Sequence, residues 1–400
     1  MSSNGPLDGI VVIDFTRIVS GPFATQILGD MGATVIKIER VPLGDDARPY
    51  GVMDEKSDGP GATFLALNRN KRSIALDLGK PEGRSVALRL LKMGDVSIHN
   101  FRPGVMERLG LDYPSIAADC PRLIYCGISG YGATGPSRES AANDLVIQAH
   151  SGLLGITGEP DGAPVRVPTP VADMTAGLYA VIGILAALHH RGETGRGQSI
   201  ETNMLEGQVN MLNYMFVDYW LNGVLPQRMG TGNRMGLPNQ AFPTSDGWIC
   251  IVAANDRAWT MCCDALGDLG LAADPRFATL TLRYRNRDEL VSEVASLTKQ
   301  FTTSECRDRM SKAGVPCAPV NSIAEAADDP QLSALETITE MTIGALGPVK
   351  LVRSPLHFSE TPITDRLPPP ELGAHTDDIL RELAMTQTEM DRLHADDAVR

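Results

Sequence analysis

The first half of the chain alternates short apolar runs with longer segments of helical character. Apolar runs over 9–15, 33–39 and 73–78 predict buried β-strands, because runs of about four to eight apolar residues between turn signals are typical of parallel sheets. Between the first two runs, Pro22 opens a predicted helix that extends to Gly32, since proline is favoured at the first helical position. This order predicts a βαβ unit.

The alternation continues to about residue 127. A helix is predicted over 81–92 and further strands over 96–101 and 123–127, with a helical pair between these strands. Repeated βα units predict an α/β fold with a Rossmann-like, doubly wound and mostly parallel sheet. Ligands bind at the carboxyl ends of the strands in such sheets, so residues at those ends are the first candidates for a site.

The second half of the chain has a different pattern. Long helices are predicted between Asp173 and about Leu221, and 223–243 is rich in Gly, Pro and Asn, which predicts a long loop. A strand over 248–253 then opens a second, smaller α/β segment. Because 400 residues exceed the usual size of one core, we expect several parts. They are a large domain over 1–222, a small domain with its linker loop over 223–330, and a C-terminal segment over 331–400.

Composition narrows the classes of partner. The net charge of −13 argues against nucleic acid and against an anionic membrane surface. The seven cysteines are odd in number and form no CxxC pair, which favours buried thiols in a reducing compartment. The first residues lack a secretory signal, and the longest apolar run, 176–188, is too short to span a bilayer. We therefore expect a soluble cytoplasmic protein.

One acidic residue, Asp173, stands at the start of the apolar segment that continues to Leu188. A carboxylate there is expected in the first turn of a helix with a buried body, near solvent and surrounded by small residues. It could be a nucleophile, an acid/base or a helix cap. On this segment alone the cap is favoured, because aspartate is a preferred N-cap residue.

Other segments reverse that preference. Together with the Asp173 segment, five motifs in this order make the chain resemble the class III CoA-transferases, the formyl-CoA transferase and carnitine CoA-transferase family. The motifs are Asp14-Phe15-Thr16-Arg17 with Gly21-Pro22, Val35-Ile36-Lys37-Ile38-Glu39-Arg40, Asn70-Lys71-Arg72-Ser73-Ile74, Thr194-Gly195-Arg196-Gly197-Gln198 and Leu372-Gly373-Ala374-His375-Thr376. The resemblance implies that Asp173 is a covalent nucleophile, that the tail packs on the first domain, and that two subunits interlock as a homodimer.

Several cations are predicted at or near strand ends, although each alone is typical of a solvated surface. Guanidinium groups suit phosphate oxygens, and coenzyme A carries a 3′-phosphate and a diphosphate. The resemblance implies CoA contacts, with Leu76 and Phe101 packing on adenine. The implied contact residues are Val19, Ser20, Arg40, Leu76, Asn100, Phe101 and Arg108. Arg17 joins this set as a contact to CoA, to a distal substrate carboxylate, or as a structural residue.

Asn143 and Asp144 precede another apolar run, where a helix cap is one interpretation and a second catalytic acid is the other. The resembled family has an acidic residue at the position of Asp144, close to the nucleophile. The related α-methylacyl-CoA racemases have His followed by Asp here, and racemisation needs an acid/base group on each face of the substrate. Because the amide of Asn143 cannot exchange protons near neutral pH, the sequence argues against a racemase.

A dinucleotide-binding enzyme is a further alternative, because 130–135 matches the pattern G-x-G-x-x-G. The context fails: Pro136 follows where a phosphate-binding helix should run, and no strand ending in an acidic residue follows about 20 residues later. Neither NAD nor FAD is therefore expected, and no metal-ligand spacing is evident.

The predicted activity is transfer of CoA from an acyl-CoA thioester to a free carboxylic acid, through an aspartyl anhydride and an aspartyl-CoA thioester. The pattern Thr16-Arg17 with Gly21-Pro22-Phe23 resembles the branch acting on dicarboxylates such as succinate or glutarate. Gly230 and Gly232 are candidates for a loop that covers the substrate, with a flexible connection as the alternative. A protein that binds acyl-CoA without turnover is the non-enzymatic alternative. Coenzyme A is then a substrate, and no tightly bound cofactor is required.

Overall fold

The computed structural model describes residues 5–51, 59–234 and 236–400. The chain folds into two compact units. The larger unit contains Met1–Leu154, Arg166–Val224 and Ser333–Arg400, and the smaller contains Gly155–Val165 and Leu225–Leu332. The segment Gly155–Val165 therefore leaves the larger unit and returns to it before the helix that carries Asp173.

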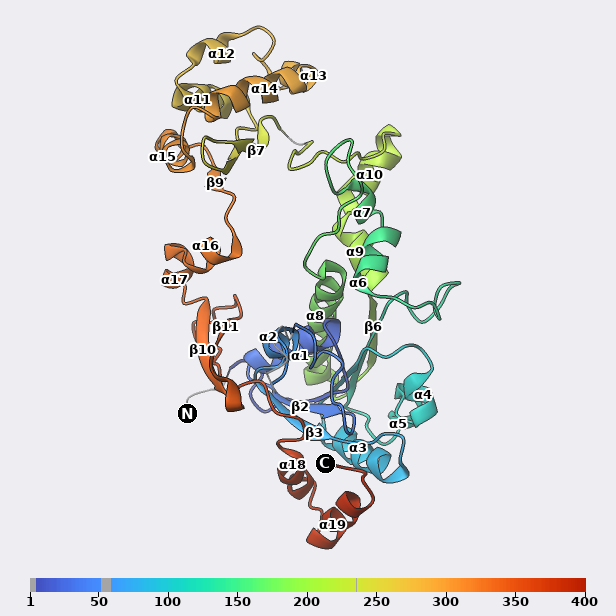
Figure 1. Ribbon diagram of the computed structural model, residues 1–400. Coiled ribbons are helices and arrows are strands. Elements are labelled where there is room, and N and C mark those ends of the chain that lie inside the picture. The colour runs from blue at the N-terminus through green and yellow to red at the C-terminus, as the bar shows by residue number, and fades with distance from the viewer. Residues whose placement is uncertain (1–4, 52–58, 235) are drawn as a thin grey trace. The chain divides into compact units, whose positions relative to one another are not determined.

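A six-stranded parallel sheet forms the centre of the larger unit (Figure 1). Its strand order is β3-β2-β1-β4-β5-β6, so the chain adds strands first on one side of β1 and then on the other. This confirms the predicted doubly wound, Rossmann-like α/β fold. The strands are β1 Val11–Asp14, β2 Thr34–Glu39, β3 Lys71–Ala75, β4 Val96–His99, β5 Ile124–Ser129 and β6 Ser199–Asn203.

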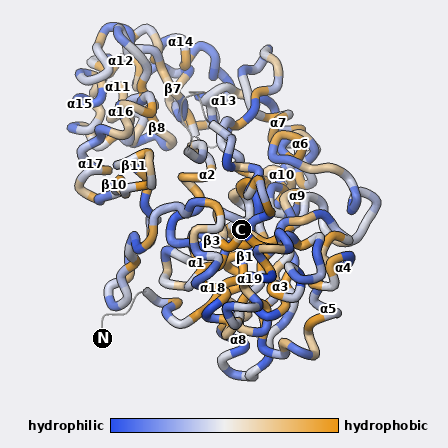
Figure 2. Tube along the Cα trace, turned by 60° about the horizontal axis from the view of Figure 1, so that its bottom comes forward, coloured by the Kyte–Doolittle hydropathy of each residue, from blue (hydrophilic) through white to orange (hydrophobic). Residues whose placement is uncertain are grey.

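Helices cover both faces of this sheet, because the central strands are apolar on both sides (Figure 2). Val12 and Ile13 are both 0% exposed and belong to different clusters of the core, one on each face. The helices of this part of the chain are α1 Ser20–Asp30, α2 Ala62–Leu67, α3 Pro81–Met93, α4 Val105–Leu109, α5 Tyr113–Ile116, α6 Asp144–His150, α7 Leu153–Ile156, α8 Val171–Thr194, α9 Met204–Met211 and α10 Asn213–Asn222.

The C-terminal tail returns to the larger unit, as predicted. It begins with an antiparallel hairpin of β10 (Ile338–Ile343) and β11 (Gly347–Val352), joined by the short 3-10 helix Gly344–Leu346, and ends with helices α18 (Thr376–Glu382) and α19 (Gln387–Ala395). Arg72 on β3 forms a two-pronged ion pair with Glu382, with both N–O distances 2.8 Å. Arg72 therefore anchors the tail.

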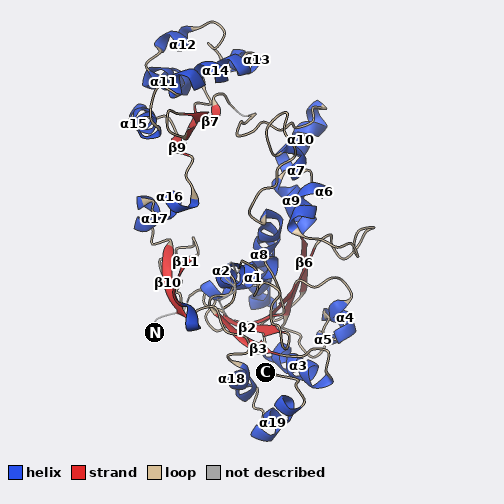
Figure 3. Cartoon of the chain, viewed as in Figure 1, coloured by secondary structure: helices blue, strands red, loops and turns tan. Residues whose placement is uncertain are grey.

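The smaller unit packs helices on a three-stranded antiparallel sheet of order β7-β8-β9 (Figure 3). Its strands are β7 Asn239–Pro243, β8 Trp248–Val252 and β9 Cys317–Pro319, and its helices are α11 Asp256–Leu266, α12 Leu269–Ala273, α13 Leu280–Arg285, α14 Arg287–Thr298, α15 Thr303–Ala313 and α16 Ile323–Ala327, with α17 (Pro330–Ala334) following. The prediction of a continuous loop over 223–243 was wrong at its end, because β7 pairs there with β8. The polar start of β7 concealed this strand.

Helix α8 is longer than the apolar run that predicted it. By length and composition alone it could cross a membrane, whereas the run over 176–188 was judged too short. Within the larger unit α8 packs against α1, α9, β5 and β6, and one of its faces lies in the core. These contacts are those of a helix in a protein core. Packing in the core therefore accounts for the apolar composition of α8.

Candidate active site

The strand order places a crevice-forming point between β1 and β4, where the sheet reverses its direction of growth. Ligands of doubly wound sheets bind at this point, beyond the carboxyl ends of the strands. The segment that follows β1 is Phe15–Val19, and Asn100 follows the end of β4. The predicted residues Arg17, Val19, Ser20 and Asn100 are thus brought together at the expected edge.

Asn100 holds the loop between β1 and α1 from one side. Its Oδ1 accepts a hydrogen bond from the Arg17 amide at 2.9 Å, and its Nδ2 donates to the Arg17 carbonyl at 2.7 Å and to Ser20 Oγ at 3.1 Å. The next residue, Ile18, has a φ of 68°, which is strained for a β-branched side chain. The side chain of Asn100 therefore helps to maintain a loop conformation that the backbone does not favour by itself.

A buried ion pair holds the same loop from the other side. Lys37, on β2, donates from Nζ to Asp45 Oδ2 at 2.7 Å and to the Thr16 carbonyl at 2.9 Å. Oδ1 of Asp45 accepts from the Ile18 amide at 3.0 Å. Both side chains of the pair are 0% exposed. The strained residue is thus bonded through its own amide to a buried charge.

A second buried pair lies behind the first. Lys71 Nζ is 3.4 Å from Asp14 Oδ2, and Asp14 also accepts from the hydroxyls of Thr16 and Thr25 at 2.5 and 2.7 Å. Burial alone would raise the pKa of Asp14, but Lys71 and Lys37 lower it below its usual range. Burial lowers the pKa of Lys71 to about 7, although Asp14 opposes the shift. Two lysines and two aspartates therefore form one buried network under the loop.

Asp173 is the third residue of α8, in the first turn of the helix. The N-cap residue is Pro170 and no side chain caps the helix, so Asp173 is not the cap that the segment alone favoured. Burial, and next the charge of Asp144, raise the pKa of Asp173 to about 6, whereas hydrogen bonds from the side chain and backbone of Ser20 lower it. A carboxylate with this pKa is still mostly ionised near neutral pH and more basic than an ordinary aspartate.

Asp144 lies on α6 and reaches the start of α8. Its Oδ1 accepts from the Ala172 amide at 2.9 Å, and its Oδ2 accepts from Gln148 Nε2 at 2.7 Å and from Arg166 at 3.3 Å. The cap of α6 is Asn143, whose Oδ1 accepts from the Val146 amide at 3.0 Å. Asn143 is therefore the cap of α6, and Asp144 supports the turn that carries Asp173; a catalytic role of Asp144 stays a prediction.

A glycine permits the close approach of Ser20 to α8. A Cβ atom at Gly177, one turn after Asp173, would lie 2.6 Å from the Ser20 carbonyl oxygen. Since real Cβ atoms do not approach backbone so closely, α1 and α8 can meet here only with glycine at this position. The Gly177 contact therefore brings Ser20 close to the first turns of α8, where Asp173 lies.

The predicted cations group in two ways. The guanidinium of Arg17 lies over the Phe101 ring, 4.8 Å from its centroid, and 3.7 Å from Asp46. Arg40, after β2, also pairs with Asp46. Arg108 is exposed on α4, and among the hydrogen bonds and ion pairs of the described residues none joins it to this group.

Leu76 and Val19 differ from the other predicted CoA contacts. Leu76 is 0% exposed and forms a bridge with Val399 of the tail, which makes it a core residue in this structure. Val19 is 8% exposed and is the N-cap residue of α1. Contacts of either side chain to adenosine stay predictions.

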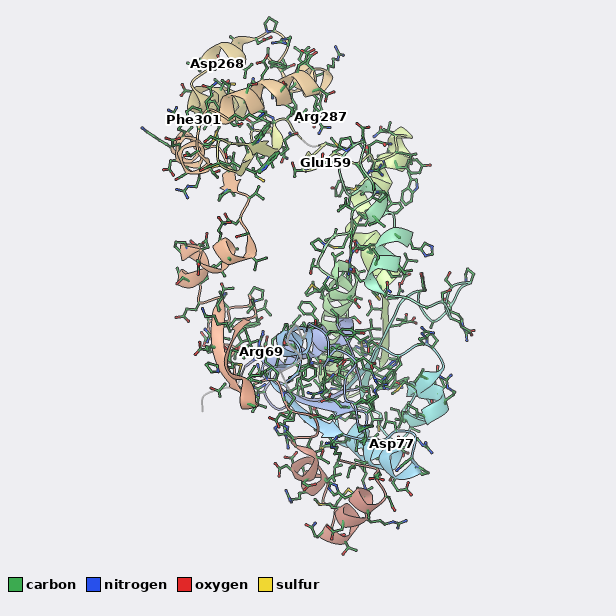
Figure 4. The ribbon with its side chains drawn as sticks, viewed as in Figure 1. Arg69, Asp77, Glu159, Asp268, Arg287 and Phe301 are labelled. Atoms are coloured by element: carbon green, nitrogen blue, oxygen red, sulfur yellow. The ribbon has the colours of Figure 1, made fainter. Side chains whose placement is uncertain are left out.

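Gly230 and Gly232 belong to the smaller unit, whereas the other candidate residues belong to the larger. The Gly230 amide donates to the Gly158 carbonyl at 2.8 Å, and φ of Gly230 is 58°. A Cβ atom at Gly230 would meet Glu159, and one at Gly232 would meet Arg287, the two residues labelled beside this loop in Figure 4. The loop is therefore a packed turn here, and its closure over a substrate stays a prediction.

The glycine pattern at 130–135 has no nucleotide-binding geometry. The next helix, α6, begins only at Asp144. The amide of Gly132 donates to Ser129 Oγ at 2.9 Å, and that of Ala133 donates to Glu201. These amides are occupied by protein oxygens, which agrees with the failed sequence context.

Sequence reasoning missed the residues that support the site from behind. Lys37 lies within one of the family motifs, but the sequence did not indicate which residue would pair with a single lysine in an apolar strand. Asp45, Gln148 and Arg166 carry no motif at all. The one available signal was the position of Lys37 in the middle of a strand expected to be buried on both faces, where a charge requires a partner.

The assembled groups surround a carboxylate whose pKa is raised to about 6 by burial and by the charge of Asp144. Asp173 is partly buried, and its neighbour Ala172 is bonded to a second carboxylate, that of Asp144. Among the described residues, no group of three or more His, Cys, Asp or Glu is arranged to hold a metal ion. The guanidinium groups of Arg17 and Arg40, which share Asp46, suit an anionic substrate.

Comparison with known proteins agrees with this description. The family model of CoA-transferase family III matches residues 7–376. The succinate–glutarate CoA-transferase of Agrobacterium fabrum is 38% identical over 384 residues, covering 94% of this chain and 96% of that protein. The acetyl-CoA:oxalate CoA-transferase of Acetobacter aceti is 39% identical over 333 residues, covering 82% and 84%. A CAIB/BAIF family protein from Brucella suis has a crystal structure with a TM-score of 0.85 and 38% identity, covering 95% of this chain and 100% of that one.

Proposed function

This chain belongs to CoA-transferase family III, and from that premise we propose that it moves CoA from an acyl-CoA to a free dicarboxylate through covalent intermediates on Asp173. The observation that carries the proposal is the place of Asp173 in the first turn of α8, next to the Ala172 amide that Asp144 binds at 2.9 Å. Burial and the charge of Asp144 also raise the pKa of Asp173 to about 6. CoA-transferase activity itself follows from the family.

The first half of the reaction loads the enzyme. An oxygen of Asp173 attacks the thioester carbonyl carbon and the C–S bond breaks. CoA leaves as a thiolate, and the acyl group stays on Asp173 as a mixed anhydride. The thiolate then attacks the aspartyl carbonyl carbon and the anhydride C–O bond breaks. The donor acid leaves as a carboxylate, and an aspartyl-CoA thioester remains.

The second half runs in reverse with the acceptor. Its carboxylate attacks the aspartyl thioester and expels CoA thiolate, which then attacks the acyl carbonyl of the new anhydride. Asp173 leaves as a free carboxylate, so no proton is consumed overall. The amide and hydroxyl of Ser20 are suited to stabilise charge at the aspartyl oxygen during each attack. Asp144 supports the first turn of α8 and keeps Asp173 basic.

A dicarboxylate acceptor is supported by the relatives and by charge. The named relatives act on glutarate or oxalate. Arg166 is half-exposed and pairs with Asp144, and Asp144 in turn binds the Ala172 amide in the first turn of α8. Asp144 therefore links a guanidinium group to this turn. A cation in that place is suited to the second carboxylate of a substrate. The phosphates of CoA are assigned to Arg17, Arg40 and Arg108.

The decisive experiment is a panel of acyl-CoA donors against free mono- and dicarboxylates, with the product esters identified by mass spectrometry. Hydroxylamine added during turnover should convert Asp173 to its hydroxamate, located by peptide mass. A non-catalytic acyl-CoA-binding protein would give neither a product ester nor a trapped peptide.

The racemase alternative is addressed in the same assay. Asn143 is occupied as the cap of α6 and offers no acid/base group. In heavy water a 2-methylacyl-CoA should therefore keep its α-proton while a suitable acid acquires CoA. Rapid deuterium uptake without CoA transfer would overturn the assignment.

A homodimer is supported by apolar surface on the larger unit. Ile182 on α8 is 60% exposed, and Trp220 and Leu221 on α10 are 71% and 78% exposed. Exposed large apolar side chains on two helices of the same unit are what a surface covered by a partner would show. Light scattering should give twice the chain mass of 42.9 kDa, and a monomer at micromolar concentration would contradict this proposal.

A further inference from the structure

Two arginines of the proposed CoA site share one carboxylate. Arg17 and Arg40 both form ion pairs with Asp46. All three side chains are between 33% and 41% exposed, so the group is accessible to a ligand. Burial lowers the pKa of Arg17, Asp46 raises it, and Arg40 lowers it, which indicates that the two guanidinium groups repel each other across the carboxylate.

The carboxylate is held in place by its neighbour. Asp45 is fixed by Lys37 and by the amides of Ile18 and Ala47, with the Ala47 contact at 2.9 Å. The backbone next to Asp46 is therefore fixed, whereas its side chain is 34% exposed and is held by the two arginines. Arg40 and Asp46 also line a cavity of about 980 Å³, which is large enough for a nucleotide.

We propose that Asp46 occupies the place of a CoA phosphate in the free enzyme and competes with that phosphate for Arg17 and Arg40. The inference rests on the proposed function, since it takes Arg40 as a CoA contact. With Asp46 between them, the two arginines present a net charge of about one to an incoming phosphate. When the carboxylate rotates away, the two arginines present a net charge of about two. CoA binding therefore has to displace an internal anion.

Such competition has a use in a transferase that binds CoA as a substrate. Asp46 reduces the affinity for CoA esters without removing the cations that orient them. Product esters can then leave, and free CoA does not block the site. The carboxylate also neutralises two guanidinium groups that would otherwise repel each other.

The test is the affinity for CoA measured by titration calorimetry at low salt. Asp46→Asn removes the charge with little change of shape, and should tighten CoA binding about three- to tenfold, the scale of one partly exposed charge interaction. The gain should shrink as salt is added, because exposed charges are screened. Asp391→Asn, an equal change of charge on exposed α19, should leave CoA affinity unchanged.

Two further arms separate the possible failures. The gain should fall when Asp46→Asn is made in an Arg40→Ala background, because the competing pair is then incomplete. Dephospho-CoA, which lacks the 3′-phosphate, identifies the phosphate that competes with Asp46. If Asp46→Asn does not tighten binding of dephospho-CoA, the competing group is the 3′-phosphate; if it does, the group is the diphosphate. Unchanged or weaker CoA binding by Asp46→Asn overturns the inference alone. Arg40→Ala should weaken CoA binding roughly tenfold or more, and CoA affinity unchanged in that variant would instead show that the proposed nucleotide site is misplaced.

Discussion

The two compact units of this protein bury charge to very different extents. In the larger unit, Asp14, Lys37 and Lys71 are all 0% exposed and lie under the loop between β1 and α1. The core of the smaller unit consists of apolar residues and cysteines, with Trp259 at 1% exposure. Of its described residues, Arg283 is the one buried charged side chain.

Arg283 differs from Lys37 and Lys71 in the groups to which it donates hydrogen bonds. Its three donors reach the carbonyls of Leu237 and Phe277 and the carboxylate of Asp256, at 2.9, 3.0 and 2.8 Å. It thus ties segments of the smaller unit to one another. In the larger unit the corresponding charge, Lys37, acts through Asp45 on the amide of the strained residue Ile18, two positions before Ser20. Buried ion pairs contribute little to stability in general, so their position is the informative property.

The largest effect is expected from the nucleophile itself. Asp173→Asn should lower turnover more than a hundredfold, the scale of a lost nucleophile. Because the native state raises the pKa of this carboxyl to about 6, ionised Asp173 destabilises the fold above that pH, and the penalty disappears as the pH falls through 6 toward the ordinary value. At pH 8 the variant should therefore gain about 1–3 kcal/mol in free energy of unfolding.

Urea unfolding and initial rates measure the two effects separately. Asp391→Asn should change neither. Activity within a factor of about ten of the unaltered enzyme would remove Asp173 from the covalent role.

The next effect compares the two units directly. Lys37→Met leaves the buried carboxylate of Asp45 unpaired and should lower the free energy of unfolding by about 3–5 kcal/mol. Arg283→Met leaves the exposed carboxylate of Asp256 in solvent, but removes the donor of two buried carbonyls and should cost about 1–3 kcal/mol for each of them. Only Lys37→Met should lower kcat per folded molecule, because only Lys37 positions the loop that presents Ser20. Equal kcat in the two variants would show that the buried network is purely structural.

A double variant separates charge burial from positioning. Lys37→Met with Asp45→Asn removes both charges while Asp45 keeps an acceptor oxygen for the Ile18 amide. Stability should recover by at least about 1 kcal/mol relative to Lys37→Met, since no unpaired charge remains. kcat should recover as well if the Ile18 bond alone positions the loop, and should stay low if the Lys37 bond to the Thr16 carbonyl is also required.

The sequence predicted the frame of the larger unit well, because apolar runs and prolines at helix starts are local signals. It also singled out Asp173, because a single acid stands at the start of an apolar helix, although the segment alone favoured a helix cap and the predicted role came from the resemblance. The smaller unit was harder: β7 begins with Asn239 and Gln240 and has no alternation before its pairing with β8. Short polar strands are defined by their partner and not by their own residues.

The environment of the nucleophile was not predictable in the same way. Asp144 comes from another helix, and its bond to the Ala172 amide depends on how α6 and α8 pack. Lys37 and Asp45 are close in sequence, but nothing local indicates that both are buried. The pKa of Asp173 is a property of these tertiary contacts, so the sequence gives the residue without its chemistry.

A smaller effect is expected at the contact between α1 and α8. Gly177→Ala places a Cβ atom 2.6 Å from the Ser20 carbonyl oxygen, so Ser20 must move away from Asp173. kcat should fall about tenfold, because small displacements of positioned groups are costly. On the same helix a Cβ atom at Gly192 meets nothing within 4 Å. Gly192→Ala should keep kcat and stabilise by about 0.5–1 kcal/mol. Equal kcat in both variants would contradict the role of Ser20.

The smallest expected effect is a shift along the pH axis. Asp173 must be ionised to attack, so kcat/KM should fall as the pH drops through about 6. Asp144→Asn keeps an acceptor for the Ala172 amide but removes the negative charge that helps to raise the pKa of Asp173. The acid limb should then move to lower pH, yet stay above that of an ordinary aspartate, because burial is the larger cause and remains.

Rates at pH 8 should change little in this variant, since Asp173 is ionised there in both proteins. The measurement is kcat/KM for the acyl-CoA donor across the acid limb. It is repeated with a second donor whose own carboxyl group has a different acidity, so that ionisation of the substrate can be told from ionisation of the enzyme. An acid limb that stays in place would mean that the two carboxylates are not coupled. A limb that moves upward would mean that the charge of Asp144, in spite of its repulsion, favours the ionised form of Asp173.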